Sequence, residues 1–443
     1  MKIFYIFIVS VLTSCCLQAQ YTAISDPNFE QELINQGIDV NQVADGQVLT
    51  SAISNITTLT LNSETAANIV NLEGIQAFTA LQELMISAHS LQTINLLQNQ
   101  FLKKLFIYNP LFSYLNISNN LNLETFYLFF ANQMTNIDIS SNINLKDVEI
   151  GYFNLTQLNV SNNIKLEKLL IRSTQVSMLD ITHNTALKNL YCNNNPINLI
   201  EVSQNVMLEK LLIWNTPISS IDVSNNEFLR TLDINNTAVQ NIDISQNALL
   251  EELFCCNNQL STLNASNNHL LNKVNCNNLN ISGNNNNITL LILQNSANTL
   301  LNGVYEIGAN PPVYLNRFDC TGNPNLQCIF VDDVANCTAN WLGKDATSQY
   351  VATQQECESL NNEAFSTNPF VLYPNPVKEV LYLENKNNDP IQKIEVFDLT
   401  GKKVMELTNA QNQINFTAIS AGLYLVKIST SKETITHKII KIE

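Results

Sequence analysis

A pattern of alternating apolar and polar residues returns every 21 residues through the middle of the chain. In the unit numbered from Leu208, the apolar residues fall at positions 1, 4, 6, 11, 14 and 16: Leu208, Leu211, Ile213, Ile218, Ile221 and Val223. Within the unit the L-x-L and I-x-V spacing has a period of two, which predicts short strands rather than helices. We therefore expect each unit to form two short strands joined by turns, with both apolar pairs facing inward.

Ten units keep this register, and a degenerate unit near Ile56 precedes them. They begin at Leu81, Leu102, Leu123, Leu145, Leu166, Leu187, Leu208, Leu229, Leu250 and Leu271. A fixed period of this kind is typical of a repeat array, in which one unit cannot bury its apolar face without a neighbour. The pattern predicts a mainly β solenoid with few helices, in which consecutive coils stack in register.

Two polar columns follow the same period. Position 19 is Asn at Asn99, Asn120, Asn142, Asn163, Asn184, Asn205, Asn226, Asn247 and Asn268, and position 17 is Ser or Thr from Ser118 to Ser266. Short polar side chains hydrogen-bond the backbone of tight turns. Because buried polar groups are normally paired, we expect both columns to be structural and to satisfy turn groups that no strand partner reaches.

These residues resemble the leucine-rich repeat family in its short bacterial form, LxxLxLxxNxLxxLDLSxNxx, over Ile56 to Ile281. At position 9 the family has Asn, whereas only Asn195 and Asn258 match it here and Thr174, Thr216 and Thr237 replace it. The resemblance implies a leucine-rich repeat solenoid over residues 56–290 that binds a partner. We expect the mixed ladder at position 9 to loosen the curvature of the horseshoe.

The flanking segments look like the caps of secreted repeat proteins. Residues 20–55 form the predicted N-terminal cap, with a short helix expected over Asp26 to Asp39, and residues 291–357 form the C-terminal cap region. In the second cap, Cys328 and Cys357 are the first candidate disulfide, and Cys320 with Cys337 is a second candidate pair. Connectivity is not fixed by sequence. Three further cysteines at inward position 6 are expected to be buried free thiols: Cys192, Cys255 and Cys276.

After a linker at residues 358–370, the chain ends in short alternating strands that predict a small antiparallel β-sandwich over residues 371–443. This region resembles the C-terminal sorting domain of the type IX secretion system of Bacteroidetes. The matching residues are Tyr373, Pro374, Asn375, Pro376, the Asp-Leu-Thr-Gly-Lys run with Gly401 and Lys402, Gly422, and the closing Lys438 to Lys441. The resemblance implies export by type IX machinery, followed by release or by attachment to the outer-membrane surface.

The first 19 residues read as a secretory signal peptide, with Lys2 before an apolar stretch and Ala19 at the cleavage site. Cys15 lies in a sequence that also fits a lipoprotein box, so acylation of this cysteine is an alternative. We expect the protein to be secreted or held on the cell surface.

Composition narrows the function. The net charge is -16 with a pI near 4.7, which excludes nucleic acid as a partner because little would neutralise its phosphates. The four histidines do not converge, and no metalloprotease, nucleophile-elbow, phosphate-loop or CxxC motif is present. We therefore expect no enzyme activity and no cofactor.

Position 15 places carboxylates on consecutive coils at Asp180, Glu201, Asp222 and Asp243, with Asp138 earlier in the array. Coils stacked about 4.8 Å apart bring like charges close together. Either these side chains spread into water or a divalent cation bridges them.

The strongest functional signal is at positions 5 and 7 of the first strand, which point away from the core. These positions carry Phe106, Tyr108, Tyr127, Phe129, Leu170, Arg172, Tyr191, Leu212, Trp214 and Phe254. A contiguous surface of this composition usually marks an interaction site. We expect it to bind a protein or a glycan. The alternatives are self-association as a surface scaffold and packing against another segment of the chain.

Overall fold

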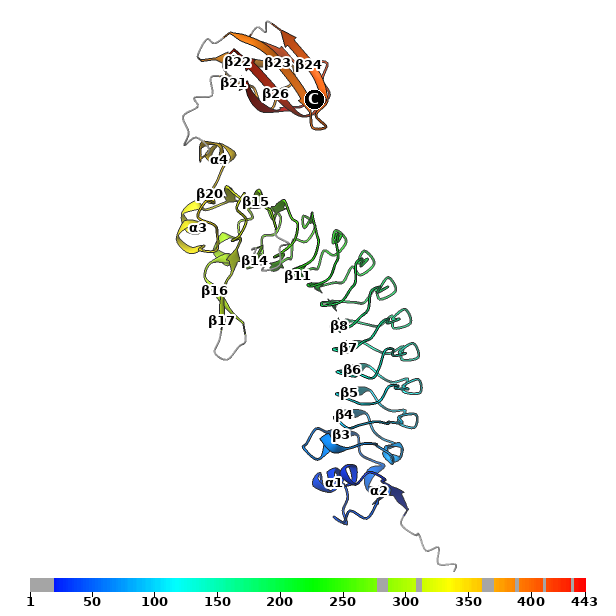
Figure 1. Ribbon diagram of the computed structural model, residues 1–443. Helices are drawn as coiled ribbons and strands as arrows, with labels where there is room; N and C mark the ends of the chain where they lie inside the picture. The colour runs from blue at the N-terminus through cyan, green and yellow to red at the C-terminus, as the bar shows by residue number, and fades with distance from the viewer. Residues whose placement is uncertain are drawn as a thin grey trace, which may run out of the picture. The chain divides into compact units, whose positions relative to one another are not determined.

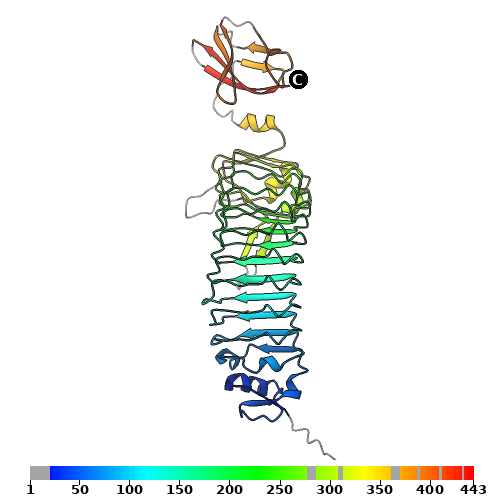
Figure 2. The same ribbon diagram turned by 90° about the vertical axis from the view of Figure 1, so that its right-hand side faces the viewer.

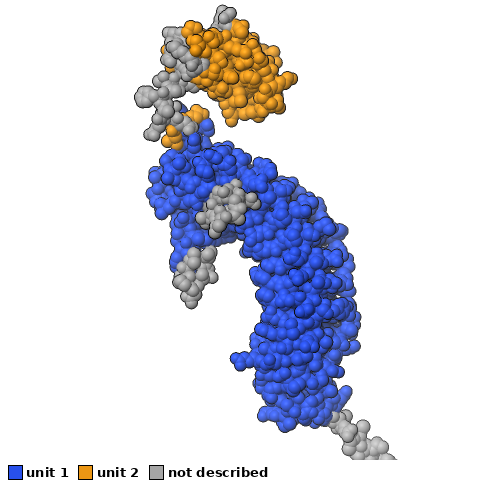
Figure 3. Space-filling model, in the orientation of Figure 1, with its two compact units in different colours: residues 1–357 blue, residues 358–443 orange. Residues whose placement is uncertain are grey.

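The computed structural model describes residues 20–276, 286–307, 313–360, 370–386, 390–408, 412–431 and 434–443. It divides into two compact units, residues 1–357 and 358–443 (Figure 3). The predicted signal peptide, Cys15 and most of the predicted linker lie outside the described residues. Within the described residues, no helix has the length and apolarity that a membrane span requires.

The first unit is a solenoid built around one parallel sheet (Figures 1 and 2). Its strands follow each other in chain order apart from the omission of β13, β15, β16 and β17 near the end. They are β3 (Thr58–Leu61), β4 (Glu83–Ser87), β5 (Lys104–Tyr108), β6 (Thr125–Phe129), β7 (Asp147–Gly151), β8 (Lys168–Arg172), β9 (Asn189–Tyr191), β10 (Lys210–Leu212), β11 (Thr231–Asp233), β12 (Glu252–Phe254), β14 (Lys273–Asn275) and β18 (Phe318–Asp319). The predicted mainly β solenoid with few helices is confirmed.

The register of this sheet follows the sequence period. Leu169 of β8 pairs with Leu190 of β9, and Leu190 pairs with Leu211 of β10, so position 4 faces position 4 in successive coils. The inward residues of positions 1, 4, 6, 11, 14 and 16 belong to one continuous hydrophobic cluster. A shift of one residue would turn these side chains to the surface, which explains why the period is kept so strictly.

The second segment of each coil differs from the prediction. Positions 14 and 16 are buried as expected, for example Ile137 and Ile139, but in most coils this segment is extended without a strand ladder. Only near the C-terminal end does a second parallel sheet form, from β13 (Thr262–Asn264), β15 (Leu290–Leu293), β19 (Cys328–Val331) and β20 (Gln349–Val351). The solenoid curves with its strands on the concave side (Figure 1), so we attribute the missing ladder to wider spacing of the coils on the convex side.

The position-19 asparagines bind one coil to the next. The Asn142 side-chain amide donates to the carbonyls of Ile117 and Asn120 at 3.0 and 2.9 Å, and the same pair of bonds recurs through Asn268. These side chains are fully buried. Their carboxamide oxygens have no hydrogen-bond partner among the described residues. The column is therefore structural, as predicted, because its side-chain NH2 groups hydrogen-bond the backbone carbonyls of neighbouring coils.

The mixed position 9 is accommodated by hydrogen bonds that either residue type can make. Asn195 donates to the carbonyls of Ile171 and Cys192, and its side-chain oxygen accepts from the Thr174 hydroxyl at 2.6 Å. Thr216 instead donates its hydroxyl to the Ile213 carbonyl at 2.6 Å. Thr216 and Asn195 thus each satisfy the position-6 carbonyl of their own coil, and Asn195 alone also reaches the preceding coil.

The N-terminal end forms the predicted helix, α1 (Pro27–Asn35), with Asp26 as its N-cap. One Asp26 oxygen accepts from the Asn28 and Phe29 amides, and the other accepts from Val70 and Asn71 in the first coil. Phe29 packs near Phe78 inside the core. The remaining elements of this end are β1 (Tyr21–Ala23), β2 (Gln47–Leu49), α2 (Thr50–Ile53), η1 (Ala66–Asn68) and η2 (Ile75–Ala77).

The region predicted as the C-terminal cap adds further coils to the solenoid, because β18 extends the first sheet and β19 and β20 extend the second. A hairpin of β16 (Val304–Ile307) and β17 (Val313–Asn316) interrupts the coils, and η3 (Asn298–Leu301), α3 (Val334–Asn340) and α4 (Gln354–Leu360) complete the region. The predicted Cys328–Cys357 disulfide is present. The second candidate pair is wrong, because Cys320 and Cys337 are separate buried thiols.

The second unit contains two antiparallel sheets. The first consists of β21 (Phe370–Tyr373), β22 (Val380–Asn385) and β25 (Gln413–Asn415). The second consists of β24 (Lys403–Thr408), β23 (Ile391–Asp398), β26 (Gly422–Thr430) and β27 (Thr434–Lys441). Buried residues of both sheets share one core, which confirms the predicted sandwich.

Two motif segments of this unit serve its turns and edges. The Asn375 side chain donates to the Lys438 carbonyl at 2.9 Å and accepts from the Ile440 amide at 2.8 Å. Asp398 accepts from the Thr400 and Lys402 amides, and Gly401 between them has a φ of +79°. The left-handed backbone favours glycine at this position.

Candidate ligand-binding face

The concave face of the solenoid carries all ten residues of the predicted strip. Phe106 and Tyr108 lie on β5, Tyr127 and Phe129 on β6, Leu170 and Arg172 on β8, Tyr191 on β9, Leu212 on β10 with Trp214 just after it, and Phe254 on β12. None of the ten belongs to the continuous hydrophobic cluster inside the solenoid. The parallel register places residues of equal position side by side on this face.

The rings are less exposed than the sequence suggested, because they pack against each other. Phe129 is 5% exposed and Leu170 9% exposed, although both point away from the core. Tyr108 stacks on Phe129 with ring centroids 5.6 Å apart, and Phe106 meets Tyr127 edge-to-face at 4.9 Å. The first part of the face is therefore one packed aromatic surface.

Two residues that sequence reasoning missed complete this surface. Position 8 of each coil has a left-handed backbone, with φ between 52° and 62° from Asn109 to Asn257. Asn or Ser fills this position in most coils, but here it is Phe130 and Tyr152. Left-handed φ is costly for aromatic residues and is concentrated at functional sites. The signal was present in the sequence as two aromatic residues in a column of Asn and Ser.

Phe130 and Tyr152 are exposed to solvent and directly follow the last residues of β6 and β7. Their rings stack in parallel, with centroids 4.7 Å apart and planes 7° apart. They remain 40% and 36% exposed. We name the group Tyr108, Phe129, Phe130, Tyr152 and Arg172 the aromatic–arginine patch.

Arg172 lies across the patch. Its guanidinium is 4.9 Å from the Tyr152 ring centroid and 5.7 Å from that of Phe129. No acidic side chain pairs with it among the described residues, and its buried Nε has no hydrogen-bond partner there. Gly151 makes room for it, because a Cβ at that position would lie 3.0 Å from Arg172 Cγ and 2.6 Å from its carbonyl oxygen. The patch therefore holds one cation whose hydrogen-bonding capacity is not used internally.

A charged cluster adjoins the patch on the same strands. Lys168 pairs with both Glu149 and Asp147, and the Tyr127 hydroxyl donates to Asp147 at 2.8 Å. Burial and the bond to Asp147 raise the pKa of Tyr127 well above its usual value. Burial also raises the pKa of Asp147, although the Tyr127 hydroxyl and Lys168 act in the opposite direction. In contrast to Arg172, Lys168 forms ion pairs with two carboxylates.

The later part of the concave face is more polar. Tyr191, Leu212, Trp214 and Phe254 are half-buried, and no ring pair joins them. Asp233 lies between Leu212 and Phe254 in register, and burial raises its pKa to about 7, although the Asn235 amide lowers it in part. At the far end, Lys273 stacks on Tyr305 of the hairpin with its Nζ 4.8 Å from the ring centroid.

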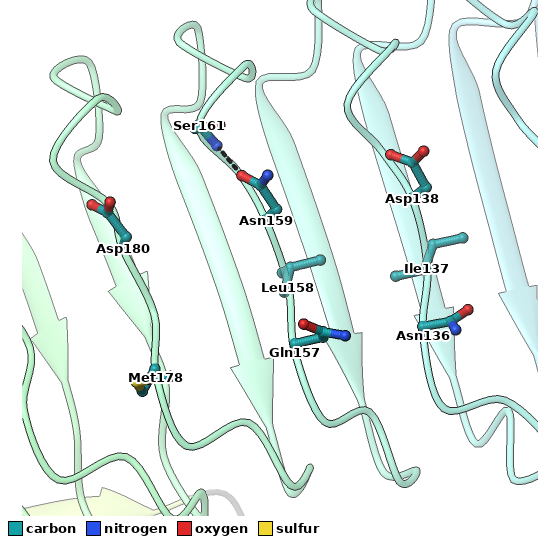
Figure 4. Close-up of a pocket in the computed structure, with 9 residues that line it drawn as sticks. All are labelled: Asn136, Ile137, Asp138, Gln157, Leu158, Asn159, Ser161, Met178 and Asp180. Atoms are coloured by element: carbon teal, nitrogen blue, oxygen red, sulfur yellow. Dashed lines mark hydrogen bonds between the residues drawn. The ribbon is translucent and has the colours of Figure 1, made fainter.

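The opposite face carries the acidic column and a shallow groove of about 730 Å³ (Figure 4). Ile137 and Leu158 line the groove together with Asp138 and Asp180, and Met178 stands beside them. Each position-15 side chain accepts a hydrogen bond from the amide two residues later, as Asn159 does from Ser161 (Figure 4). The hydroxyl and then the amide of Thr182 lower the pKa of Asp180. The amides and then the hydroxyls of Ser203, Ser224 and Ser245 lower the pKa values of Glu201, Asp222 and Asp243.

These carboxylates therefore close their own turns. Among the described residues, no group of three or more His, Cys, Asp or Glu side chains is placed to hold a metal ion. The inward thiols are also shielded, and burial raises the pKa of Cys192 to about 12.

The last 73 residues match a known family: residues 371–443 fit the family described as "Secretion system C-terminal sorting domain". This region is a sorting domain. The match confirms the resemblance inferred from the motifs at Tyr373 to Pro376 and at Gly401. The sorting domain supports export of the chain to the cell exterior.

A search of curated proteins gives no match. Among solved structures, the chain is similar to the functional domain of InlJ from Listeria monocytogenes, which includes a cysteine ladder, with 16% identity, 96% of this chain and 100% of that chain covered, and a TM-score of 0.40. It is also similar to internalin C2 of the same organism, with 19% identity, 48% and 96% coverage, and a TM-score of 0.40. A leucine-rich repeat protein of Leptospira interrogans has 14% identity, 70% and 92% coverage, and a TM-score of 0.38. Similarity at this level says nothing about ligands.

Proposed function

We propose that the protein is a secreted or surface-attached leucine-rich repeat protein that binds a protein partner through its concave face. The observation that carries this proposal is the aromatic–arginine patch. It combines two exposed aromatic residues in costly left-handed conformations with a guanidinium that has no acidic partner among the described residues. Strain of this kind persists where the surrounding structure holds it for a purpose.

The geometry favours a protein partner over a glycan. Sugars stack on free ring faces, whereas Tyr152 has Phe130 on one side and is in cation–π contact with Arg172. Phe129 is likewise in contact with Tyr108 and Arg172. Aromatic residues and Arg are the residues that dominate protein interfaces. Arg172 offers its free donors to a carboxylate of the partner. The sorting domain supplies the export route, and the protein acts as a binder rather than an enzyme.

The test is capture of surface proteins of the source cells by the full-length protein. A variant with Tyr152→Asn and Arg172→Gln should lose the captured protein, because both the ring stack and the guanidinium are removed. The matched control is Met178→Asn with Leu199→Asn, two exposed residues of the opposite face. Equal capture by the patch variant and the control would reject the patch as the binding site, and so would the absence of any protein retained selectively by the wild type.

A further inference from the structure

One edge of the solenoid carries a row of exposed apolar side chains. They lie in the turns just before the concave strands, next to the buried Asn column. The row consists of Phe101, Leu121, Ile143, Ile164, Val206, Phe228 and Leu270, with exposed fractions of 62, 54, 53, 58, 46, 48 and 41%. Single exposed apolar residues need no explanation, but a contiguous line of them marks a contact surface. We call it the apolar edge row.

A file of alternating charges runs beside the row at position 2 of the coils. It reads Lys103, Glu124, Lys146, Glu167, Lys188, Glu209, Arg230 and Glu251, with neutral Gln82 before it and neutral Asn272 after it. Backbone hydrogen bonds link each of these residues to the next, from the Lys103 amide on the Gln82 carbonyl to the Asn272 amide on the Glu251 carbonyl. The charges therefore stand in one straight file, which we call the charge ladder.

Some of the alternating charges form ion pairs between neighbouring coils of the same chain. Lys146 pairs with Glu124 at 2.7 Å, Lys188 with Glu167 at 2.7 Å and Arg230 with Glu251 at 2.5 Å. All six side chains remain at least 38% exposed. Pairing within the stack explains alternate signs, but it does not explain why an apolar row lies next to them.

We infer that a second copy of this chain covers this edge, with the two solenoids antiparallel. Reversing the direction of one ladder sets Lys103 opposite Glu251, Glu124 opposite Arg230, Lys146 opposite Glu209 and Glu167 opposite Lys188. Every charge then meets its opposite. A parallel pairing would set each charge against itself, so the ladder is self-complementary in the antiparallel sense alone. This is the requirement of a two-fold interface.

The apolar edge row fits the register that the ladder sets. Each turn of the row lies two or three residues before a ladder residue, so Ile143 faces Val206 and Leu121 faces Phe228. Nearest the two-fold axis, Ile164 faces the turn of Thr185 and Ala186, whose small side chains interrupt the row and allow close approach of the two copies.

Curvature and overall charge point to the same partner. The solenoid is curved (Figure 1). Two equal arcs superimpose along their length when one is reversed end to end and both open to the same side, whereas arcs that open to opposite sides diverge. A chain of net charge -16 repels its own copy except through a charge-balanced surface. The ladder has four cations and four anions, whereas the acidic column at position 15 has no cation. A membrane or another anionic surface would favour an excess of lysine instead.

Sedimentation of the full-length protein tests the interface. The wild type should form a dimer, and Ile143→Asp with Ile164→Asp should weaken association by about tenfold or more, since charges would enter a buried apolar contact. The matched control, Met178→Asp with Leu199→Asp, changes exposed residues of the opposite face and should leave the dimer intact. A monomeric wild type, or a dimer that the edge variant does not weaken, would overturn the inference.

Charge-reversal and cysteine variants test the antiparallel register without depending on stability. Lys146→Glu and Glu209→Lys should each weaken self-association, but a mixture of the two should form mixed dimers, since position 146 of one copy faces position 209 of the other. Under mild oxidation by oxidised glutathione, Ile164→Cys should cross-link to a copy carrying Thr185→Cys, and Leu121→Cys should cross-link only to a copy carrying Phe228→Cys. Self-cross-linking of Leu121→Cys would instead indicate parallel pairing and would refute the proposed register.

Discussion

The coils from Leu102 to Arg172 and those from Leu187 to Cys276 share one core and one backbone register, but their concave faces differ. The earlier coils have five-residue strands, stacked rings and Arg172, whereas the later coils have three-residue strands, isolated rings and a half-buried aspartate. The inward residues are equivalent in both regions. Since stability requires the same core in both, the difference on the surface is the part of the sequence that is free to encode recognition.

The largest expected effect is on the free energy of unfolding and concerns the hydrophobic core that the two regions share. Leu169→Ala in β8 and Leu232→Ala in β11 each remove a fully buried side chain at position 4, one in each region. Each should lower the free energy of unfolding by about 2–5 kcal/mol, the usual cost of a large cavity. Urea denaturation followed by circular dichroism measures both.

Because each coil contacts mainly its neighbours, the two losses should be similar. A loss confined to the earlier coils would show that the concave rings contribute to folding and are not free for binding.

The second effect distinguishes the later coils. The pKa of Asp233 is about 7 in the folded protein because burial disfavours its charged form, whereas its unperturbed value is 3.8. A carboxyl group with a raised folded pKa favours folding less as it ionises, so stability should fall as pH rises from about 4 to 7. Asp233→Asn should raise the melting temperature at pH 8 and change it little at pH 4.

The earlier coils supply the control for this measurement. Glu149 occupies the equivalent position 5, but its carboxylate is paired with Lys168. Glu149→Gln should therefore lower the melting temperature at pH 8 rather than raise it. If both variants shifted in the same direction, burial would not be the cause of the Asp233 behaviour.

The sequence predicted most of what the two regions share and least of what separates them. Period and register follow from which residues face inward, so Leu169, Leu211 and the Asn column could be placed in advance. Cys328 with Cys357 was also predicted. The contacts of Phe130 and Tyr152 were not, because they depend on side chains about 21 residues away that meet only after the coils stack.

The convex side and the C-terminal end show a second limit of the sequence. The I-x-V alternation predicts extended, half-buried segments, but it does not reveal whether neighbouring coils come close enough for a ladder of hydrogen bonds. Beyond Leu271 the period is interrupted by the hairpin insertion, so the coil residues Phe318 and Ile329 were assigned to a cap. Coils can be recognised in the sequence only where their spacing is regular. An insertion therefore hides a coil from the sequence even where the solenoid continues.

A smaller effect follows from the left-handed turns. Phe130→Asn should raise the free energy of unfolding by about 1 kcal/mol, because Asn tolerates positive φ better than Phe. The reciprocal change in the later coils, Asn215→Phe, should lower it by about the same amount. If Phe130→Asn is instead destabilising, the stack on Tyr152 outweighs the backbone strain, and the aromatic residues at position 8 are structural.

The smallest effect is expected at Asp222, on the opposite face of the same coil that leads to Asp233. Its pKa is lowered by the bond from the Ser224 amide, so its contribution to stability is present at neutral pH and is lost as pH falls below its unperturbed value. Asp222→Asn keeps an oxygen that accepts this bond, as Asn159 and Asn264 do in their coils. We expect little change in melting temperature at pH 7, and no shift on adding calcium, since each carboxylate already serves its own turn. A calcium-dependent rise that disappears in Asp222→Asn would instead show that a cation bridges the acidic column.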